Sequence, residues 1–313
     1  AGDDPQVRTF EQVAEVFKEA FEQGDNLVCI MAAGIAVRSL APHLRGKDTD
    51  PAVVVVDEAG KFAISLLSGH LGGANQLARL VAQILKGTPV ITTATDVQGL
   101  PALDLAAVQA GLAIENLPAV RQVQMALLSG LSLRLVDPDG YLADLAEKDP
   151  GRFIYHTDLD QALAGGWPGV YAGYRERAWP PAWLILRPKN LIMGMGCHRG
   201  TPAGEILKFI ENTFKQERLS LACLKALATI EVKKDEPGLQ EAAARLGVEF
   251  IWFTKEELQL VKVPNPSPKV IRLVGVVSVS EAAALKAGGA ELILTKRKGD
   301  NVTLAVAKAP RAA

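Results

Sequence analysis

The stretch with the clearest chemical potential is a glycine-rich segment that contains a histidine, Ser68-Gly-His-Leu-Gly-Gly-Ala-Asn75. It lies between a segment that reads as a strand and an amphipathic segment that reads as a helix. Gly72 and Gly73 permit close backbone approach, and the helix N-terminus offers unpaired amides and a positive dipole end. Such a turn binds carboxylate or phosphate or stabilises an oxyanion, and His70 can serve as general acid or base near neutral pH. The alternative is a tight strand-to-helix turn that merely needs glycines; the histidine, beside Asn75, favours the functional interpretation.

A second polar cluster, Thr92-Thr-Ala-Thr-Asp96, follows the next predicted strand. Ligands of open α/β sheets bind beyond the carboxyl ends of the strands, so we expect this cluster to lie beside the His70 loop. Asp96 can orient His70 as a carboxylate does in a catalytic triad, act as a base itself, or cap the segment that follows. The sequence leaves these roles open.

A third segment, Gly194-Met-Gly-Cys-His-Arg-Gly200, precedes a helix for which Thr201 is the expected N-cap and Pro202 the first residue. Its glycine spacing is one residue longer than the dinucleotide fingerprint, so we do not predict NAD binding. We interpret the segment as a second anion-binding turn, in which Arg199 binds a carboxylate bidentately. Cys197 either has a pKa lowered by the helix N-terminus, as a nucleophile or metal ligand, or is simply packed.

These segments supply most of the candidate site residues, and His70 and Asp96 are the predicted catalytic pair. Most residues predicted to bind a ligand lie in the same segments: Gly69, Gly72, Gly73, Asn75, Thr92, Thr93, Thr95, Gly196, Cys197, Arg199 and Gly200. Arg38 lies outside them and is predicted to bind a ligand because its charge suits a carboxylate. The chain has four histidines, and Cys197-His198 lacks the spacing of a zinc site, so no metal held by the protein is expected.

The elements around the first two segments predict an α/β unit. A capping box at Thr9 to Gln12 predicts a helix that ends at Gly24, and the apolar runs 27–30 and 53–56 predict strands buried on both faces. Further strands are predicted over 62–66 and 89–93. The helix between these two strands has an apolar stripe made of Leu77, Leu80, Val81, Ile84 and Leu85. Strand, helix and strand at this spacing indicate a parallel sheet with right-handed crossovers.

A second α/β unit is predicted from residue 191 onwards. It includes a strand at 191–194, a strand at 248–253, and a closing hairpin that joins 291–296 to 302–306. Capping boxes are predicted at Thr254 to Glu257 and at Ser278 to Glu281, and the second gives Glu281 a structural role. Between the two units the signal is weak.

Length and composition frame these predictions. The 313 residues, 49% hydrophobic and 22% charged, predict an α/β protein of two α/β units with mainly parallel sheets joined by a small middle region. We place the N-terminal domain at 1–130, the middle domain or linker at 131–188 and the C-terminal domain at 189–313. A net charge of −1 gives no support for binding to nucleic acid or a membrane, and three widely spaced cysteines favour a reducing, cytoplasmic location.

Several long stretches resemble the CbiG family of cobalamin biosynthesis. Those that resemble its N-terminal part are Asp50-Pro-Ala-Val-Val-Val-Val-Asp57, Ser65 to Asn75, and Val90-Ile-Thr-Thr-Ala-Thr-Asp96. Those that resemble its C-terminal domain are Gly194-Met-Gly-Cys197, Leu227 to Lys233, Asp235-Glu236, and Ser278-Val-Ser-Glu-Ala-Ala-Ala-Leu285. Both sets occur in the family's order, and the resemblance covers nearly the whole chain except the middle.

The resemblance implies hydrolysis of cobalt-precorrin-5A in anaerobic cobalamin biosynthesis. This reaction opens a δ-lactone on a cobalt-containing tetrapyrrole and releases a two-carbon fragment as acetaldehyde, giving cobalt-precorrin-5B. We assign His70 as acid and base, Asp96 as its partner or a second base, and the Gly72 and Gly73 amides as oxyanion donors. Arg38 and Arg199 would hold carboxylates of the macrocycle.

The resemblance also implies the cofactor and partners. Cobalt arrives within the substrate, so no cofactor of the protein's own is expected, and neighbouring enzymes of the pathway are further candidate partners. A non-catalytic corrinoid-binding or carrier protein of the same pathway is the alternative, because the C-terminal unit resembles a domain that also occurs alone. A protein that binds a sugar nucleotide or phosphate ligand is a third reading, which the missing dinucleotide fingerprint disfavours.

Overall fold

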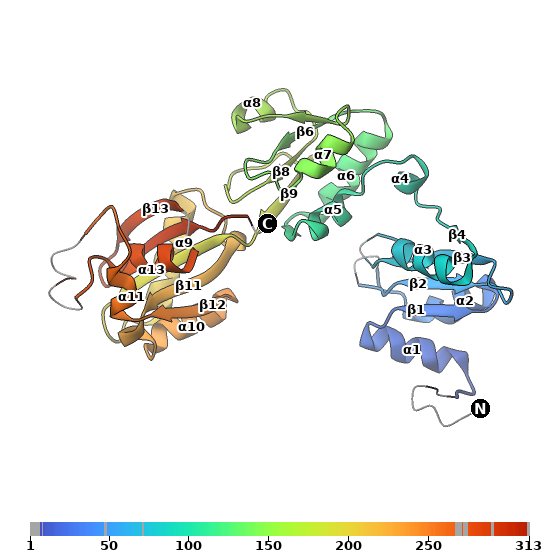
Figure 1. The fold of residues 1–313 in the computed structure, drawn as a ribbon, viewed down its shortest axis with the longest axis horizontal. Helices are drawn as coiled ribbons and strands as arrows, with labels where there is room; N and C mark the ends of the chain where they lie inside the picture. Colours follow the sequence, from blue (N-terminus) through green and yellow to red (C-terminus); the bar gives the residue numbers. More distant parts are fainter. Residues whose placement is uncertain are drawn as a thin grey trace. The chain divides into compact units, whose positions relative to one another are not determined.

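The computed structural model describes residues 7, 9–46, 49–70, 72–266, 271, 275–288 and 291–311. The protein has the mixed α/β fold with mostly parallel sheets that the sequence predicts, and it contains a third sheet, in the middle region, that the sequence does not predict (Figure 1). Its two compact units are Ala1–Gln109 with Leu127–Leu131, and Ala110–Ala126 with Ser132–Ala313. The boundaries predicted at 130 and 188 stay a prediction. In the described part of the chain no helix combines the length and apolar character needed to cross a membrane.

The first unit contains a four-stranded sheet in the order β1-β2-β3-β4. Its elements are α1 (Val13–Gln23), β1 (Leu27–Ile30), α2 (Ala33–Leu40), the 3₁₀ helix η1 (Ala41–His43), β2 (Val53–Val56), β3 (Phe62–Leu67), α3 (Ala74–Leu85), β4 (Thr88–Val90), α4 (Ala94–Val97) and α5 (Leu103–Gln109). β1 pairs with β2 and β3 with β4 in parallel, whereas β2 and β3 form an antiparallel hairpin. The predicted unit β3-α3-β4 is therefore confirmed.

Helices cover the two faces of this sheet unequally. Phe17 of α1 and Leu40 of α2 pack on one face, and α3 packs on the other over β2, β3 and β4. β2 is buried throughout, as predicted. The same prediction is wrong for β1, where Val28 is 45% and Ile30 68% exposed, because α3 does not extend over that edge strand.

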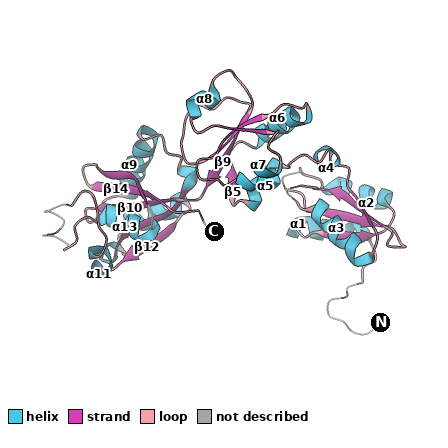
Figure 2. Cartoon of the chain, turned by 45° about the horizontal axis from the view of Figure 1, so that its top comes forward, coloured by secondary structure: helices cyan, strands magenta, loops and turns pink. Residues whose placement is uncertain are grey.

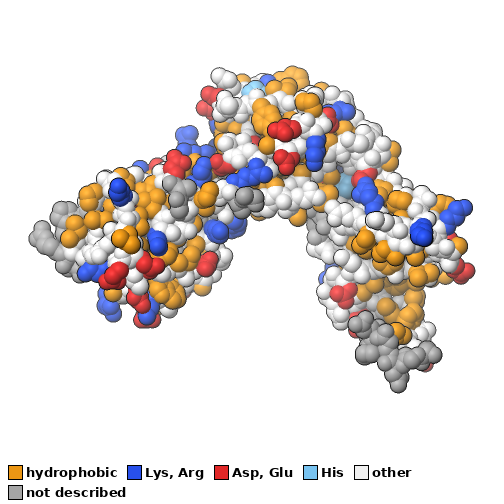
Figure 3. Space-filling model, in the orientation of Figure 1, with side chains coloured by type: hydrophobic (Ala, Val, Ile, Leu, Met, Phe, Trp, Pro, Cys, Tyr) orange, Lys and Arg blue, Asp and Glu red, His pale blue; other side chains and the backbone are white. Residues whose placement is uncertain are grey.

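The buried face of α3 also differs from the prediction. Its small residues Ala74, Ala78 and Ala82 lie against the sheet, so the helix approaches the strands closely. Leu80 and Ile84, from the predicted apolar stripe, are 53% and 69% exposed. Hydrophobic side chains are exposed on the surface of this unit (Figure 3). This helix has two apolar faces, and the face with the smaller side chains is the buried one.

The second unit contains two five-stranded sheets. The first, in the order β5-β9-β8-β6-β7, forms where the sequence signal is weak. Its elements are β5 (Leu112–Ile114), α6 (Leu117–Leu128), β6 (Leu133–Val136), α7 (Ala143–Lys148), β7 (Phe153–Tyr155), α8 (Leu159–Leu163), β8 (Gly169–Ala172) and β9 (Trp183–Pro188). Trp183 is fully buried, and Gly169 permits the close approach of its ring.

The other sheet of this unit has the order β12-β11-β10-β14-β13. Its elements are β10 (Leu191–Cys197), α9 (Ala203–Gln216), η2 (Leu221–Cys223), β11 (Leu224–Ile230), η3 (Glu231–Lys233), α10 (Pro237–Leu246), β12 (Glu249–Phe253), α11 (Lys255–Gln259), α13 (Val279–Gly288), β13 (Glu291–Lys298) and β14 (Val302–Lys308). β10, β11 and β12 are parallel, and β13 and β14 form the predicted hairpin. Figure 2 shows the strands of this sheet between helices.

α9 and α10 pack on one face of this sheet, and α13 packs on the other. α13 lies close to β10 at Gly194, where a Cβ would clash with the carbonyl of Ser280. Glycine at this position therefore lets the first turn of α13 approach the carboxyl end of β10.

The predicted helix caps have mixed outcomes. The capping box at Thr254 is confirmed, as is the end of α1 at Gly24. The boxes at Thr9 and Ser278 are wrong: α1 begins after Gln12, which makes no capping hydrogen bond, and the Ser278 hydroxyl has no partner. Thr201 does not cap α9 either. That helix begins after Pro202, and the Thr201 hydroxyl donates to the carbonyl of His198 at 2.8 Å.

Candidate functional site

The predicted catalytic pair lies at one edge of the sheet of the first unit. His70 follows β3, and Asp96 belongs to α4, which follows β4. Because β3 and β4 are parallel neighbours, their carboxyl ends meet at the same edge and bring the two segments together, as expected. The turn before His70 is closely defined: Ser68 adopts a φ of 58°, rare for a residue with a side chain, and its hydroxyl donates to the carbonyl of Asp50 at 2.8 Å.

The imidazole of His70 lies between two carboxylates. Its Nε2 is 3.2 Å from Oδ2 of Asp96 and 3.1 Å from Oγ1 of Thr95. Its Nδ1 is 3.6 Å from Oδ2 of Asp104. The side chain is 19% exposed, so the ring is held on both nitrogens while part of it stays accessible to a ligand. Both ring nitrogens can therefore exchange a proton with an acid group.

Asp96 is fixed by donors from α3. Its Oδ1 accepts a hydrogen bond from the Arg79 guanidinium at 2.6 Å, and its Oδ2 accepts one from Nδ2 of Asn75 at 2.9 Å. The same Nδ2 donates to Oγ1 of Thr93 at 3.0 Å, and the Ser65 hydroxyl donates to Oδ1 of Asn75 at 2.7 Å. Both amide hydrogens of this buried asparagine are thus used inside the protein, which makes it a positioning residue for Asp96.

The two aspartates make His70 a stronger base than a free histidine. The hydrogen bond and charge of Asp104 raise the pKa of His70 above its ordinary 6.5, against the effect of burial, and Asp96 adds to the rise. Burial alone would raise the pKa of Asp104, but its hydrogen bond and charge interaction with His70 outweigh burial and lower it. The resting site therefore favours an imidazolium flanked by carboxylates.

Asp104 and Arg79 are site residues that the sequence interpretation missed. Asp104 of α5 contacts His70 through a tertiary contact, which local patterns do not reveal. The sequence feature that could have indicated Asp104 is its place among apolar residues of a short helix, in which Leu103 and Ala107 are fully buried. Arg79 belongs to the polar face of α3, where an arginine is usually a solvated side chain.

The loop amides are already occupied. The N–H of Gly73 donates to the carbonyl of His70 at 2.9 Å, and the N–H of Ala74 donates to that of Ser68 at 3.1 Å. Asn75 completes the pattern by donating its backbone N–H to the carbonyl of Gly69 at 3.0 Å. The prediction that the Gly73 amide is an oxyanion donor is therefore wrong, because the carbonyl of His70 already accepts its hydrogen. The same role for the Gly72 amide stays a prediction.

The glycines of this loop have steric reasons of their own. A Cβ at Gly72 would clash with the side chain of Ser68, and a Cβ at Gly69 would lie 2.8 Å from Oδ1 of Asn75. Gly73 has a φ of 86°, which favours glycine. The tight-turn interpretation thus accounts for the glycines, and the functional interpretation of this loop depends on His70.

Two further predicted ligand contacts do not join this cluster. Arg38 on α2 and Thr92 before α4 are exposed, and neither makes a hydrogen bond or ion pair with His70 or Asp96 in the described ranges. Their roles toward a ligand stay predictions.

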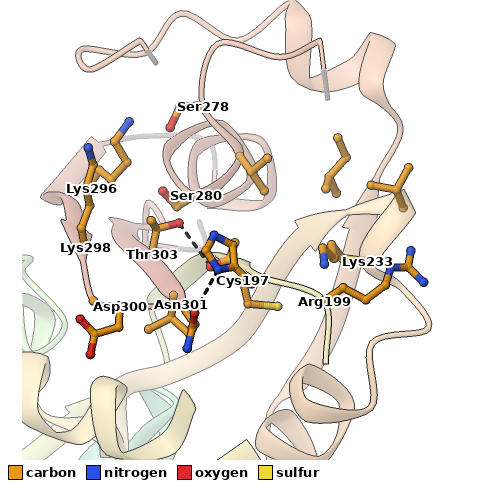
Figure 4. Close-up of a pocket in the computed structure, with 17 residues that line it drawn as sticks. Cys197, Arg199, Lys233, Ser278, Ser280, Lys296, Lys298, Asp300, Asn301 and Thr303 are labelled. Atoms are coloured by element: carbon orange, nitrogen blue, oxygen red, sulfur yellow. Dashed lines mark hydrogen bonds between the residues drawn. The ribbon is translucent and has the colours of Figure 1, made fainter. Parts of the chain in front are cut away.

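The third predicted segment borders a cavity of about 470 Å³ in the second unit (Figure 4). Gly196, Cys197 and Arg199 line it, together with residues of α13, β13 and β14. Gly200 lies beside it, but its N–H donates to Oε1 of Glu236. Lys233 pairs with the same carboxylate at 3.2 Å. An internal anion therefore already occupies the turn predicted to bind an external one.

Cys197 does not have the chemistry of an activated thiol. Burial raises its pKa to about 11, and the charge of Lys233 does not reverse this. The alternative in which the helix N-terminus lowers its pKa is therefore wrong, since the thiol stays protonated at neutral pH. Within the described ranges, no group of three or more His, Cys, Asp or Glu side chains is arranged to hold a metal ion.

Comparison with known proteins places these observations in a family. Residues 15–96 match the family described as cobalamin synthesis G N-terminal, and residues 191–307 match cobalamin synthesis G C-terminus. A cobalt-precorrin-5A hydrolase of Priestia megaterium is 39% identical over 299 residues, covering 93% of this chain and 80% of that protein. The chain belongs to the CbiG family.

The comparison with known proteins also finds a second hydrolase and a solved structure. A cobalt-precorrin-5A hydrolase of Salmonella typhimurium is 35% identical, covering 94% of this chain and 85% of that protein. Among solved structures, CobE, a protein from the cobalamin (vitamin B12) biosynthetic pathway, is 34% identical over 37% of this chain and 91% of its own, with a TM-score of 0.36.

Proposed function

We propose that this chain is a cobalt-precorrin-5A hydrolase, which opens the δ-lactone of its tetrapyrrole substrate and releases acetaldehyde to give cobalt-precorrin-5B. The observation that carries the proposal is identity of 35–39% over more than nine-tenths of the chain to two proteins of that name. The contacts of His70 with Asp96 and Asp104 supply acid and base groups that the reaction needs.

Lactone opening is the first step. Asp96 removes a proton from water as its oxygen attacks the lactone carbonyl carbon, and the acyl carbon–oxygen bond breaks. The imidazolium of His70 gives its proton to the departing ring oxygen, which becomes a hydroxyl. His70 and the Arg79 guanidinium, which contacts Asp96 at 2.6 Å, supply the positive charge that stabilises the oxyanion in place of loop amides.

Loss of the two-carbon fragment restores both groups. His70, now neutral, takes the proton of the new hydroxyl, whose oxygen forms the carbonyl of acetaldehyde as the carbon–carbon bond breaks. The electron pair stays on the macrocycle carbon, which accepts the proton held by Asp96. His70 is again an imidazolium and Asp96 a carboxylate, so one pair of groups serves both steps.

Asp104 and Asn75 act through this pair. Asp104 contacts Nδ1 of His70, whereas Asp96 contacts Nε2, and Asp104 keeps the ring protonated before lactone opening. Asn75 holds Asp96 against the ring.

Cobalt is part of the substrate, and the proposed chemistry uses no metal held by the protein. Neighbouring enzymes of the pathway as partners, and a cytoplasmic location, belong to the same proposal.

The experiment is incubation of the purified chain with cobalt-precorrin-5A, with acetaldehyde measured by coupled oxidation. Stoichiometric acetaldehyde with formation of the ring-opened product supports the proposal. Tight binding of the macrocycle without acetaldehyde would instead identify a carrier of the pathway.

A further inference from the structure

The cavity of the second unit contains two buried hydroxyls without a partner. Ser278 and Ser280, at the start of α13, are each 1% exposed and line the cavity. Neither hydroxyl oxygen has a hydrogen-bond partner in the described structure. A buried polar group without a partner costs stability, so two such hydroxyls at one cavity point to a polar ligand that binds there.

The backbone at this point also favours an anion. α13 is ten residues long, and the amides of its first turn have no partner within the helix. They lie at the positive end of the helix dipole. The acid of this turn, Glu281, is engaged elsewhere: its Oε1 accepts from Nδ2 of Asn265 at 2.8 Å and from the backbone N–H of Lys296 at 3.0 Å.

Positive side chains surround the two serines. Figure 4 shows Lys296 and Lys298 on one side of the cavity and Arg199 and Lys233 on the other. Lys233 pairs with Glu236, and the Lys296 ammonium donates to the carbonyl of Asn265 at 2.8 Å and feels the charge of Glu281. Arg199 and Lys298 form no ion pair with a described residue. Asp300 is the one acidic residue among those that line the described cavity. Glu281, the internal anion on the α13 side, is bound by Asn265 and Lys296, so no internal carboxylate reaches the hydroxyls of Ser278 and Ser280 in the described structure.

We propose that this cavity is a carboxylate-binding site, in which the hydroxyls of Ser278 and Ser280 and the first-turn amides of α13 bind a carboxylate while Lys296 and Lys298 supply positive charge. The carboxylate belongs to a side chain of the tetrapyrrole, and this identification rests on the proposed function. Arg199, predicted to hold a carboxylate from the Gly194–Gly200 turn, then serves the same cavity from its opposite side.

The test measures binding of two cobalt corrinoids to the full chain by equilibrium dialysis. Cobyrinic acid carries free carboxylates, and cobinamide carries amides in their place. We expect the wild type to bind cobyrinic acid at least about tenfold more tightly, with an affinity that falls as salt rises. Ser278→Ala with Ser280→Ala should weaken cobyrinic acid binding about tenfold, because hydrogen bonds to a charged group are lost.

Charge variants provide the second arm. Lys296→Gln with Lys298→Gln should weaken binding about tenfold and flatten its salt dependence. Lys208→Gln with Lys225→Gln removes the same charge from exposed positions outside the cavity and should leave binding unchanged. Inorganic phosphate serves as competitor, and binding of phosphate more tightly than cobyrinic acid overturns the carboxylate assignment.

Thermal stability separates binding from a merely structural role. Removing hydroxyls that have no partner should leave the melting temperature unchanged or raise it, although binding weakens. Ser220→Ala, at a buried serine outside this cavity, is the matched control and should bind normally. Unchanged binding in the double serine variant, or a loss of binding that follows a loss of stability, overturns the site.

Acetaldehyde release on the same preparations distinguishes the two proposals. A wild type that releases acetaldehyde, with serine variants that bind normally, refutes the carboxylate site alone. A wild type that releases none, with the expected binding pattern intact, refutes the hydrolase alone.

Discussion

Replacing Asp104 by Asn tests whether this buried carboxylate tunes His70. The substitution keeps the shape of the side chain and removes its charge from a position 3.6 Å from Nδ1 of His70. Because Asp104 is the largest cause of the raised pKa of His70, the Asp104→Asn variant should have a His70 pKa closer to the ordinary value of 6.5. The resting imidazolium then loses its proton at a lower pH.

The expected loss of rate follows from the geometry. Hydrogen bonds to charged groups contribute about 1.5–3 kcal/mol, and shorter contacts lie at the upper end. At 3.6 Å the two atoms form an ion pair longer than a hydrogen bond, so the contribution is at most the lower end of that range, and about 1.4 kcal/mol corresponds to a tenfold change in rate. We therefore expect turnover near neutral pH to fall by up to about tenfold.

The assay is the pH profile of acetaldehyde release. In the proposed mechanism activity needs a protonated His70, so the profile declines on the alkaline side as pH rises through the pKa of His70. Asp104→Asn should move that decline to lower pH, whereas Asp25→Asn, at an exposed aspartate, should not. An alkaline limb that stays in place while the variant remains folded would refute the role given to Asp104.

Three further results follow from the same contacts. His70 has a raised pKa and Asp104 a lowered one, so their pairing stabilises the fold fully between about pH 3.8 and 6.5. The melting temperatures of wild type and His70→Gln should differ most in that window, and the difference should narrow as pH rises above it or falls below it; a constant difference would contradict the pairing. Cys197→Ser should retain acetaldehyde release within about twofold, because a thiol with a pKa of about 11 is protonated, and a loss of a hundredfold would return Cys197 to the mechanism. Gly72→Ala should lower the free energy of unfolding by about 1–3 kcal/mol in urea titration, because its Cβ would meet Ser68, and a neutral result would mean that the turn can relax.

The proximity of the His70 and Asp96 segments could be predicted because it follows from topology, whereas the contact between the two side chains could not. Two parallel neighbouring strands bring the segments after them to one edge of the sheet, whatever the details of the loops. Asp104 could not be predicted in this way. Its approach depends on how α5 packs against the His70 loop, and that packing is a tertiary contact with no fixed sequence spacing.

Helix faces and anion turns show where local patterns were insufficient. On α3 both the alanine and the leucine faces are apolar, so periodicity locates the helix without choosing the buried side. At Gly73 and Gly200 the sequence indicates an anion-binding backbone, but carbonyls of the loop and the carboxylate of Glu236 occupy the amides instead. The middle sheet was missed because most of its strands are three or four residues long, too short to establish a period.

The most direct test of the catalytic assignment is single-turnover acetaldehyde release by His70→Ala, measured together with the affinity for the macrocycle. Loss of the acid and base group predicts a rate at least about a hundredfold below wild type with substrate affinity retained. Near-normal release by a folded His70→Ala variant would contradict the proposal that this imidazole moves the protons of the reaction.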